Sequence, residues 1–182
     1  MKLAVDVHYS RNSARAAGVA FEKWSDPAPL LTLTVSTPIM AEYVPGSLYL
    51  RELPPILSLI HKLRKDEGIW PEYIVIDGYV WLTSRRLPGL GLHLHQQLAQ
   101  QPGPRPRVIG VAKNPYKDTP APTLFRGGSK KPLFITAAGV NEQMAVAFIA
   151  SMHGRSRIPD LLKLADSLSR QADHEERQEQ SQ

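Results

Sequence analysis

The clearest structural signal in the sequence is the stretch Tyr73-Ile74-Val75-Ile76-Asp77-Gly78. A short, almost uninterrupted apolar run of this kind is typical of a parallel strand that is buried on both faces. A second such run, Arg107–Ala112, lies downstream, and the segment Gly89–Gln100 between them has the length of a short helix. This alternation of strand and helix predicts parallel strands at the centre of a sheet, and such strands present ligands at their carboxyl ends.

The residues upstream of this unit follow a different pattern. Apolar and polar side chains alternate in Leu3–Tyr9 and again in Leu30–Ser36, which is the period of a strand with one apolar face. The segment Ala16–Trp24 is also interpreted as extended. Three consecutive strands with polar connections predict an antiparallel meander. The expected fold class is therefore α/β, with a mixed sheet that begins with three antiparallel strands, continues with parallel strands and is flanked by helices.

Helices and a further strand are expected in the rest of the chain. The spacing of apolar residues predicts a helix from about Leu53 to Lys65, with Pro54 and Pro55 in its first turn, where a missing N–H is tolerated. The segment Asn114–Lys131 is rich in Pro, Gly, Lys and Arg and is interpreted as a loop or hairpin. The remaining expected elements are a strand at Pro132–Thr136 and helices at Glu142–Met152 and Ile158–Arg170.

Composition limits the kinds of protein that this chain can be. Its 182 residues, 42% of them apolar, suffice for one domain with a sizeable core, which we place at residues 1–170. The absence of cysteine excludes disulfides, thiolate zinc sites, iron–sulfur clusters and cysteine nucleophiles. Residues 171–182 are polar and acidic and are expected to form a disordered tail.

The charge distribution indicates what the chain could bind. The net charge is +5, and residues 171–182 hold four acids and one arginine, so residues 1–170 carry +8. This excess suits a polyanion such as nucleic acid, although a solvated basic surface without a partner is the commoner cause. The longest uncharged run, Pro27–Ala41, is too short to span a bilayer, and Asp6 interrupts the apolar amino terminus. A cytoplasmic protein without membrane spans is expected.

Three acidic residues and one lysine are candidates for chemistry. Asp6 lies within an apolar strand, Asp77 ends the buried strand before a glycine, and Glu52 precedes the start of a helix. Each acid also has a structural interpretation. Asp6 could pair with an arginine or lie on an exposed face of the sheet, Asp77 could form a turn, and Glu52 could be stabilised by the helix amino terminus. Together they offer the oxygen ligands that Mg²⁺ or Mn²⁺ prefers, and such an ion activates water and neutralises charge during phosphodiester hydrolysis. Lys113, at the next strand end, would add positive charge at the scissile phosphate.

Several blocks of sequence, in order along the chain, carry a family resemblance. They are Tyr43-Val44-Pro45-Gly46-Ser47-Leu48, Arg51-Glu52-Leu53-Pro54, Ile76-Asp77-Gly78, Arg85-Arg86-Leu87, Ile109-Gly110-Val111-Ala112-Lys113 and Pro132-Leu133-Phe134-Ile135. In this order they resemble the endonuclease V family over about residues 3–170. The resemblance implies a ribonuclease-H-like fold and a magnesium-dependent endonuclease, with Mn²⁺ as a substitute ion, that hydrolyses a phosphodiester bond 3′ to deoxyinosine or inosine. Its partners would be DNA, RNA or both, in DNA repair or inosine-RNA processing. A monomer is assumed, and the sequence leaves the oligomeric state open.

For the metal site, the resemblance implies that Asp6, Glu52 and Asp77 are the ligands. It also implies that Lys113, which ends the family's Gly-Val-Ala-Lys block, takes part in catalysis with them. They are the same four residues that stand out from the sequence alone: one acid within a strand, an acid and a lysine at strand ends, and an acid just before a helix.

For the substrate, the resemblance implies a wedge and a base-binding region. Tyr43, beside Pro45, would stack where the damaged base leaves its neighbours, which offsets part of the unstacking free energy. Gly46, Gly78 and Gly110 would let the backbone approach the extruded hypoxanthine, although glycine serves tight turns as often.

One departure from the family pattern bears on activity. The family has a Gly-His pair shortly after the block matched by Pro132–Ile135, and that histidine helps at the metal site, whereas residues 137–141 contain no histidine. Asn141 and Glu142 are the candidates to replace it with an oxygen ligand. The departure motivates an alternative function, that of a catalytically impaired relative that binds nucleic acid. A third hypothesis is an unrelated α/β protein in which the acids are incidental.

Overall fold

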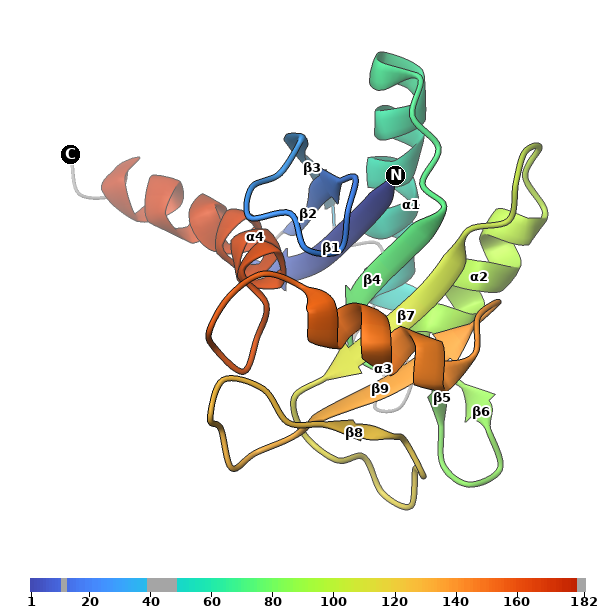
Figure 1. The fold of residues 1–182 in the computed structure, drawn as a ribbon. Coiled ribbons are helices and arrows are strands. Elements are labelled where there is room, and N and C mark those ends of the chain that lie inside the picture. Colours follow the sequence, from blue (N-terminus) through green and yellow to red (C-terminus); the bar gives the residue numbers. More distant parts are fainter. Residues whose placement is uncertain (11–12, 39–48, 180–182) are drawn as a thin grey trace.

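The structure is a computed structural model that describes residues 1–10, 13–38 and 49–179, with side chains described as far as residue 171. The strands are β1 Lys2–Tyr9, β2 Ser13–Phe21, β3 Leu31–Pro38, β4 Tyr73–Asp77, β5 Trp81–Leu82, β6 Leu87–Pro88, β7 Arg107–Ala112, β8 Thr123–Leu124 and β9 Leu133–Ala138. The helices are α1 Tyr49–Glu67, α2 Leu90–Ala99, α3 Glu142–Ser151 and α4 Asp160–Glu179. One sheet has the strand order β3-β2-β1-β4-β7-β9-β8, and β5 pairs with β6 in a separate hairpin (Figure 1).

The mixed character of the sheet is confirmed. β1 pairs antiparallel with β2, and β2 pairs antiparallel with β3. β4, which contains the apolar run described above, lies at the centre of the sheet and pairs parallel with both β1 and β7. β9 pairs antiparallel with β7, so the parallel part of the sheet consists of β1, β4 and β7.

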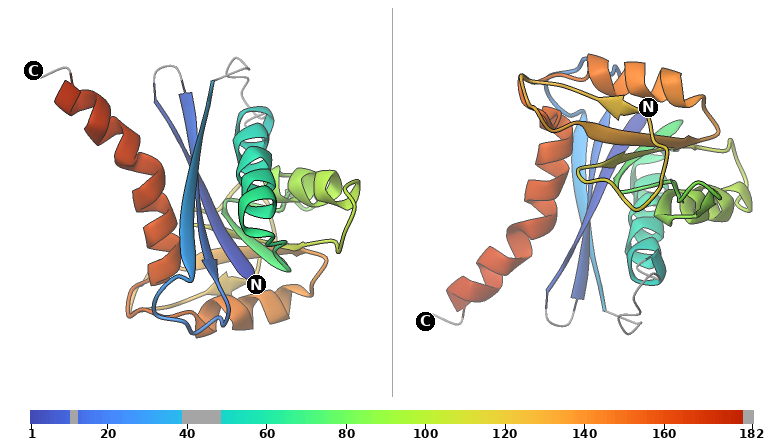
Figure 2. Two further views of the ribbon diagram at one scale, coloured as in Figure 1. Left: turned by 90° about the horizontal axis from the view of Figure 1, so that it is seen from above. Right: turned by 90° about the horizontal axis from the view of Figure 1, so that it is seen from below.

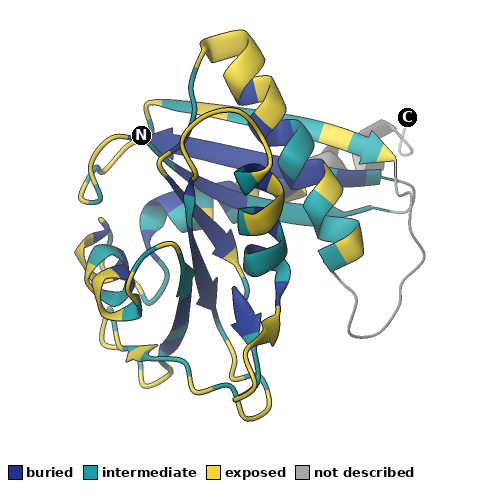
Figure 3. Ribbon diagram, turned by 90° about the vertical axis from the view of Figure 1, so that its right-hand side faces the viewer, coloured by how far each residue is buried: buried dark blue, intermediate teal, exposed yellow. Residues whose placement is uncertain are grey.

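Helices cover both faces of the sheet. α1 and α2 pack on one face, and α3 and α4 pack on the other (Figure 2). Because side chains alternate along a strand, each face has its own core. Leu3 and Ile74 belong to the core beside α1 and α2, whereas Ala4 and Val75 belong to the core beside α3 and α4. Figure 3 shows that the buried residues follow the central strands.

The predicted start of α1 near Leu53 is wrong. The helix includes Tyr49, so Pro54 and Pro55 lie beyond its first turn. Each proline removes one N–H that would bond a carbonyl group in the preceding turn. Packing offsets this loss, because α1 buries five side chains: Pro55, Ile56, Leu59, Ile60 and Leu63.

The last helix extends further than predicted. α4 continues to Glu179, beyond residue 170, where we placed the end of the domain. Its first half packs against β1 and β2, and its second half projects away from the sheet (Figures 1 and 2). The division of the chain into a domain at residues 1–170 and a tail at residues 171–182 stays a prediction. Among the described helices, none has the length and apolar composition needed to cross a membrane.

Candidate active site

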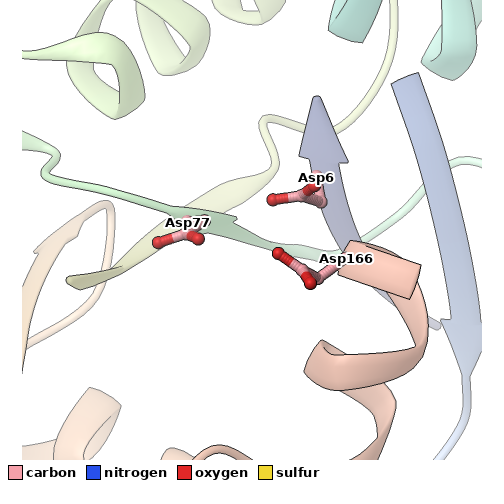
Figure 4. A group of neighbouring side chains, drawn as sticks. All are labelled: Asp6, Asp77 and Asp166. Carbon is pink, nitrogen blue, oxygen red and sulfur yellow. The ribbon is translucent and has the colours of Figure 1, made fainter. Parts of the chain in front are cut away.

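Three carboxylates meet beside the central strands. Asp6 lies on β1, Asp77 ends β4 and Asp166 lies on α4, and one oxygen of each lies within 4.8 Å of the others. Figure 4 shows the three side chains around a common space between the two strands and the helix. Like charges at this separation repel one another unless donors or a cation compensate them. The sequence predicted that Asp6, Glu52 and Asp77 would meet. The closest group in the structure contains Asp6 and Asp77, and adds Asp166.

The pleat of the strands explains this arrangement. In the parallel register of β1 and β4, Val5 pairs with Ile76, and both belong to the core beside α1 and α2. Since side chains alternate along a strand, the next residues, Asp6 and Asp77, face the opposite side. α4 packs against β1 on that side and brings Asp166 to them.

Burial and charge both act on Asp6. Its pKa lies above the usual range, first because burial disfavours the charged form and also because Asp77 and Asp166 are negative. The hydroxyl of the buried Ser169, 2.5 Å from Asp6 Oδ2, and the charge of Lys113 oppose this rise. A bound cation would act in the same direction as these two groups, by favouring the carboxylate.

Lys113 lies beside the acids, as its position after β7 predicted. Its ammonium nitrogen is 2.6 Å from Asp77 Oδ2 and 3.8 Å from Asp166 Oδ1. Burial acts to lower the pKa of Lys113, but the hydrogen bond to Asp77 and the nearby carboxylates raise it overall. The Arg157 guanidinium donates to the backbone carbonyls of Lys113 and Pro132, and so fixes the segment that carries the lysine. Lys113 therefore stays charged at the edge of the acidic group.

Glu52 approaches the acids from α1. It lines a cavity with Asp6 and Asp77, but it is not one of the three described carboxylates that lie within 4.8 Å of one another. Burial, followed by the charges of Asp6 and Asp77, raises the pKa of Glu52 to about 7, and Arg51 opposes the rise. The structure thus brings the three predicted acids into one region, with Asp166 rather than Glu52 in the closest group.

A cavity of 340 Å³ opens beside the carboxylates. Asp77 lies at its edge, and the aromatic side chains of Tyr49, Tyr79 and Tyr116 line it. Gly78, with φ of +133°, forms part of the wall and has open space where a Cβ would stand. Flat rings around a cavity of this kind can stack on a flat ligand.

The structure places Gly110 below this wall. It is buried, and a Cβ there would stand 2.5 Å from the Gly78 carbonyl oxygen, 2.8 Å from the Thr136 hydroxyl and 2.9 Å from the Val80 nitrogen. Gly110 therefore lets β7 pack closely beneath the backbone of the wall. Close packing alone accounts for a glycine at this position, and its approach to a substrate stays a prediction.

Neither predicted replacement for the histidine belongs to the acidic group. The Asn141 side chain caps the amino terminus of α3. Glu142 Oε1 accepts a hydrogen bond of 2.8 Å from the Trp81 indole and lies 3.6 Å from the Arg86 guanidinium. Both side chains are engaged elsewhere, and the additional carboxylate of the acidic group comes from α4.

Asp166 is the candidate that the sequence analysis missed. It lies close to the buried residues Leu161, Ala165 and Ser169 along α4. An acid next to the apolar stripe of an amphipathic helix is the signal that could have revealed it. Three predicted substrate-binding residues lie outside the described residues, and their roles stay predictions: Tyr43, Pro45 and Gly46.

The donor set fits a hard divalent cation. Mg²⁺ and Mn²⁺ prefer oxygen ligands and bind through a few carboxylates while they keep some waters. Asp6, Asp77 and Asp166 offer such oxygens at close range. Lys113 neutralises only part of their charge, so a cation would relieve the remaining repulsion.

Comparison with known proteins identifies the family. Residues 3–150 match the family model described as Endonuclease V. This chain belongs to the endonuclease V family. The hypothesis of an unrelated α/β protein is therefore wrong, and the resemblance predicted from the ordered blocks is confirmed.

Curated relatives support the assignment to the endonuclease V family. Endonuclease V of Streptomyces coelicolor is 31% identical over 191 residues, an alignment that covers 92% of this chain and 77% of that protein. Endonuclease V of Streptomyces avermitilis is 34% identical over 151 residues, which cover 71% of this chain and 61% of the relative. This chain thus matches less than two thirds of the length of the latter protein.

Solved structures of endonuclease V share the fold. An endonuclease V from Ciona intestinalis, in complex with DNA that contains an inosine, gives a TM-score of 0.79 at 20% identity and covers 96% of this chain and 86% of its own. The catalytic domain of human endonuclease V gives a TM-score of 0.78 at 23% identity, with coverage of 96% and 82%. The predicted ribonuclease-H-like fold is confirmed.

Proposed function

We propose that this family member is a metal-dependent endonuclease that hydrolyses a phosphodiester bond 3′ to deoxyinosine or inosine, with Mg²⁺ or, in its place, Mn²⁺. The observation that carries the proposal is the convergence of Asp6, Asp77 and Asp166 beside Lys113 and an aromatic cavity. An ion held by such carboxylates supplies activation of water and neutralisation of charge on the reacting phosphate. The +8 charge of residues 1–170 suits a DNA or RNA substrate.

The residues around the acidic group would have distinct roles. Asp6, Asp77 and Asp166 would hold the ion. Glu52, with a pKa of about 7, can accept or release a proton at its carboxyl oxygens near neutral pH. Lys113 would bind a phosphate oxygen, because its ammonium group is charged and lies at the edge of the acidic group.

The 340 Å³ cavity would hold the extruded base. Extrusion costs a few kcal/mol of stacking and pairing, and stacking on an aromatic side chain returns about 1–3 kcal/mol per base. The Tyr79 hydroxyl donates to the Asn114 carbonyl oxygen at 2.8 Å, which fixes one ring of the wall before a ligand arrives, and Tyr116 lies beside it. The inosine-containing DNA in the structure of the Ciona intestinalis relative supports this choice of base.

Cleavage of defined oligonucleotides tests the proposal. The full chain is incubated with Mg²⁺ or Mn²⁺ and end-labelled DNA or RNA that contains one inosine, and products are sized on a denaturing gel. We expect a single cut 3′ to the inosine and none in matched strands with guanine at that position. Asp77→Asn should abolish the cut, whereas Asp66→Asn, which changes an exposed acid on α1, should retain it. Binding without product in either metal would instead establish the catalytically impaired relative.

A further inference from the structure

Ser169 is a buried hydroxyl beside the acidic group that has no role in the proposed reaction. Its side chain is fully buried on α4. Its oxygen lies 2.5 Å from Asp6 Oδ2 and 2.8 Å from the carbonyl oxygen of Asp166 in the preceding turn. A hydroxyl has one proton to donate, and a carboxylate is a stronger acceptor than a backbone carbonyl. Ser169 therefore donates to ionised Asp6.

This hydrogen bond holds a carboxylate that its neighbours repel. Asp6 lies within 4.8 Å of oxygens of Asp77 and Asp166. Lys113 forms close ion pairs with those two acids, whereas Ser169 contacts Asp6 directly. A donor on one carboxylate oxygen restricts rotation of the group, so the other oxygen keeps its direction.

We propose that Ser169 is a positioning residue of the metal site, which orients Asp6 toward the space that it shares with Asp77 and Asp166. The inference rests on the proposed function, because it concerns the same ion. Groups that hydrogen-bond a metal ligand fix its orientation, and their removal commonly lowers metal affinity or activity by 10–100-fold. α4 thus supplies one ligand, Asp166, and, three residues later, the donor that orients another ligand on β1.

The test compares Ser169→Ala with Ser167→Ala, which removes a hydroxyl from an exposed position of the same helix. Mn²⁺ alone is titrated into the metal-free full chain, and binding is read from the loss of the free-ion signal in electron paramagnetic resonance. We expect Ser169→Ala to weaken Mn²⁺ binding by about 10–100-fold and Ser167→Ala to leave it unchanged. The Mn²⁺ concentration that gives half-maximal cleavage should rise by the same factor, with a smaller change in the rate at saturating Mn²⁺.

A second variant keeps the test valid if the alanine variant does not fold. Ser169→Cys has a similar shape and a weaker donor, so we expect an affinity between those of the parent and Ser169→Ala. Parental affinity in both variants would overturn the inference and leave the proposed function standing, since the parent still binds Mn²⁺. An equal loss in Ser167→Ala would overturn it as well. A parent chain that neither binds Mn²⁺ nor cleaves would contradict the proposed function itself.

Discussion

Replacement of Glu52 by glutamine tests how much the ionisation of this buried carboxyl group lowers the unfolding free energy of the protein without metal. Burial, and then the charges of Asp6 and Asp77, raise the pKa of Glu52 from 4.5 to about 7. Between these values the folded state binds more protons than the unfolded state, so stability falls as pH rises. The contribution of Glu52 is fully present below pH 4.5 and is lost as pH passes through 7. At ~1.4 kcal/mol per pKa unit, the loss amounts to about 3 kcal/mol.

Glutamine has no carboxyl group to titrate, so the Glu52→Gln variant should not lose this contribution as pH rises. We expect the unfolding free energy of the variant minus that of the parent to be about 3 kcal/mol larger at alkaline pH than at acidic pH. Urea unfolding in the presence of EDTA, followed by circular dichroism near pH 4 and near pH 8.5, measures this difference. The comparison between the two pH values cancels any effect of the amide that does not depend on pH. Glu67→Gln, at an exposed position near the end of α1, is the matched control. An equal difference between variant and parent at both pH values would refute the reasoning.

Three further variants probe the site and its support. Asp166→Asn should lower cleavage by about 100-fold or more while binding of the inosine strand persists, because charge stabilisation of several kcal/mol depends on the ion; a rate equal to that of the parent would contradict its role as a ligand. Gly110→Ala should lower the unfolding free energy by about 1–3 kcal/mol in urea, because its Cβ would stand 2.5 Å from the Gly78 carbonyl oxygen; unchanged stability would show that this packing is not tight. Tyr116→Ala should weaken binding of an inosine strand by about 1–3 kcal/mol in fluorescence anisotropy and affect an inosine-free strand less, and an equal loss for both strands would exclude a role in base binding.

The strands could be predicted because burial leaves a direct pattern in the sequence. β4 is covered on both faces, and Tyr73–Ile76 is accordingly apolar throughout. β1 is only partly buried beyond Val5, and its sequence alternates. The start of α1 could not be predicted in this way, since the local preference of Pro54 and Pro55 for a first turn is outweighed by side chains that pack against a distant sheet.

The membership of the acidic group was harder to predict than the strands. Asp6 and Asp77 could be placed together because their strands were expected in one sheet and both residues match acids implied by the family resemblance. The third close carboxylate depends on which helix covers the face to which they point, and that follows from the topology of the whole chain. Asp166 reaches that face from α4, whereas Glu52 reaches the strand ends from α1. The apolar stripe of α4 indicates that Asp166 lies beside a packed helix face, but it does not tell which strands that face covers.

Residues beyond the part of the chain that matches the family model complete this site. The match ends at residue 150, whereas Arg157, Asp166 and Ser169 all follow it. α4 packs on β1 and β2 and buries Leu161 and Ala165, so the same packing places its acid and its hydroxyl beside the β1 carboxylate. An ion that binds oxygens from both elements must, by linkage, also stabilise the docked helix. If the acidic group binds an ion as proposed, packing of α4 and metal binding would therefore be coupled. A substitution that loosens this helix would then weaken ion binding even where the sheet stays folded.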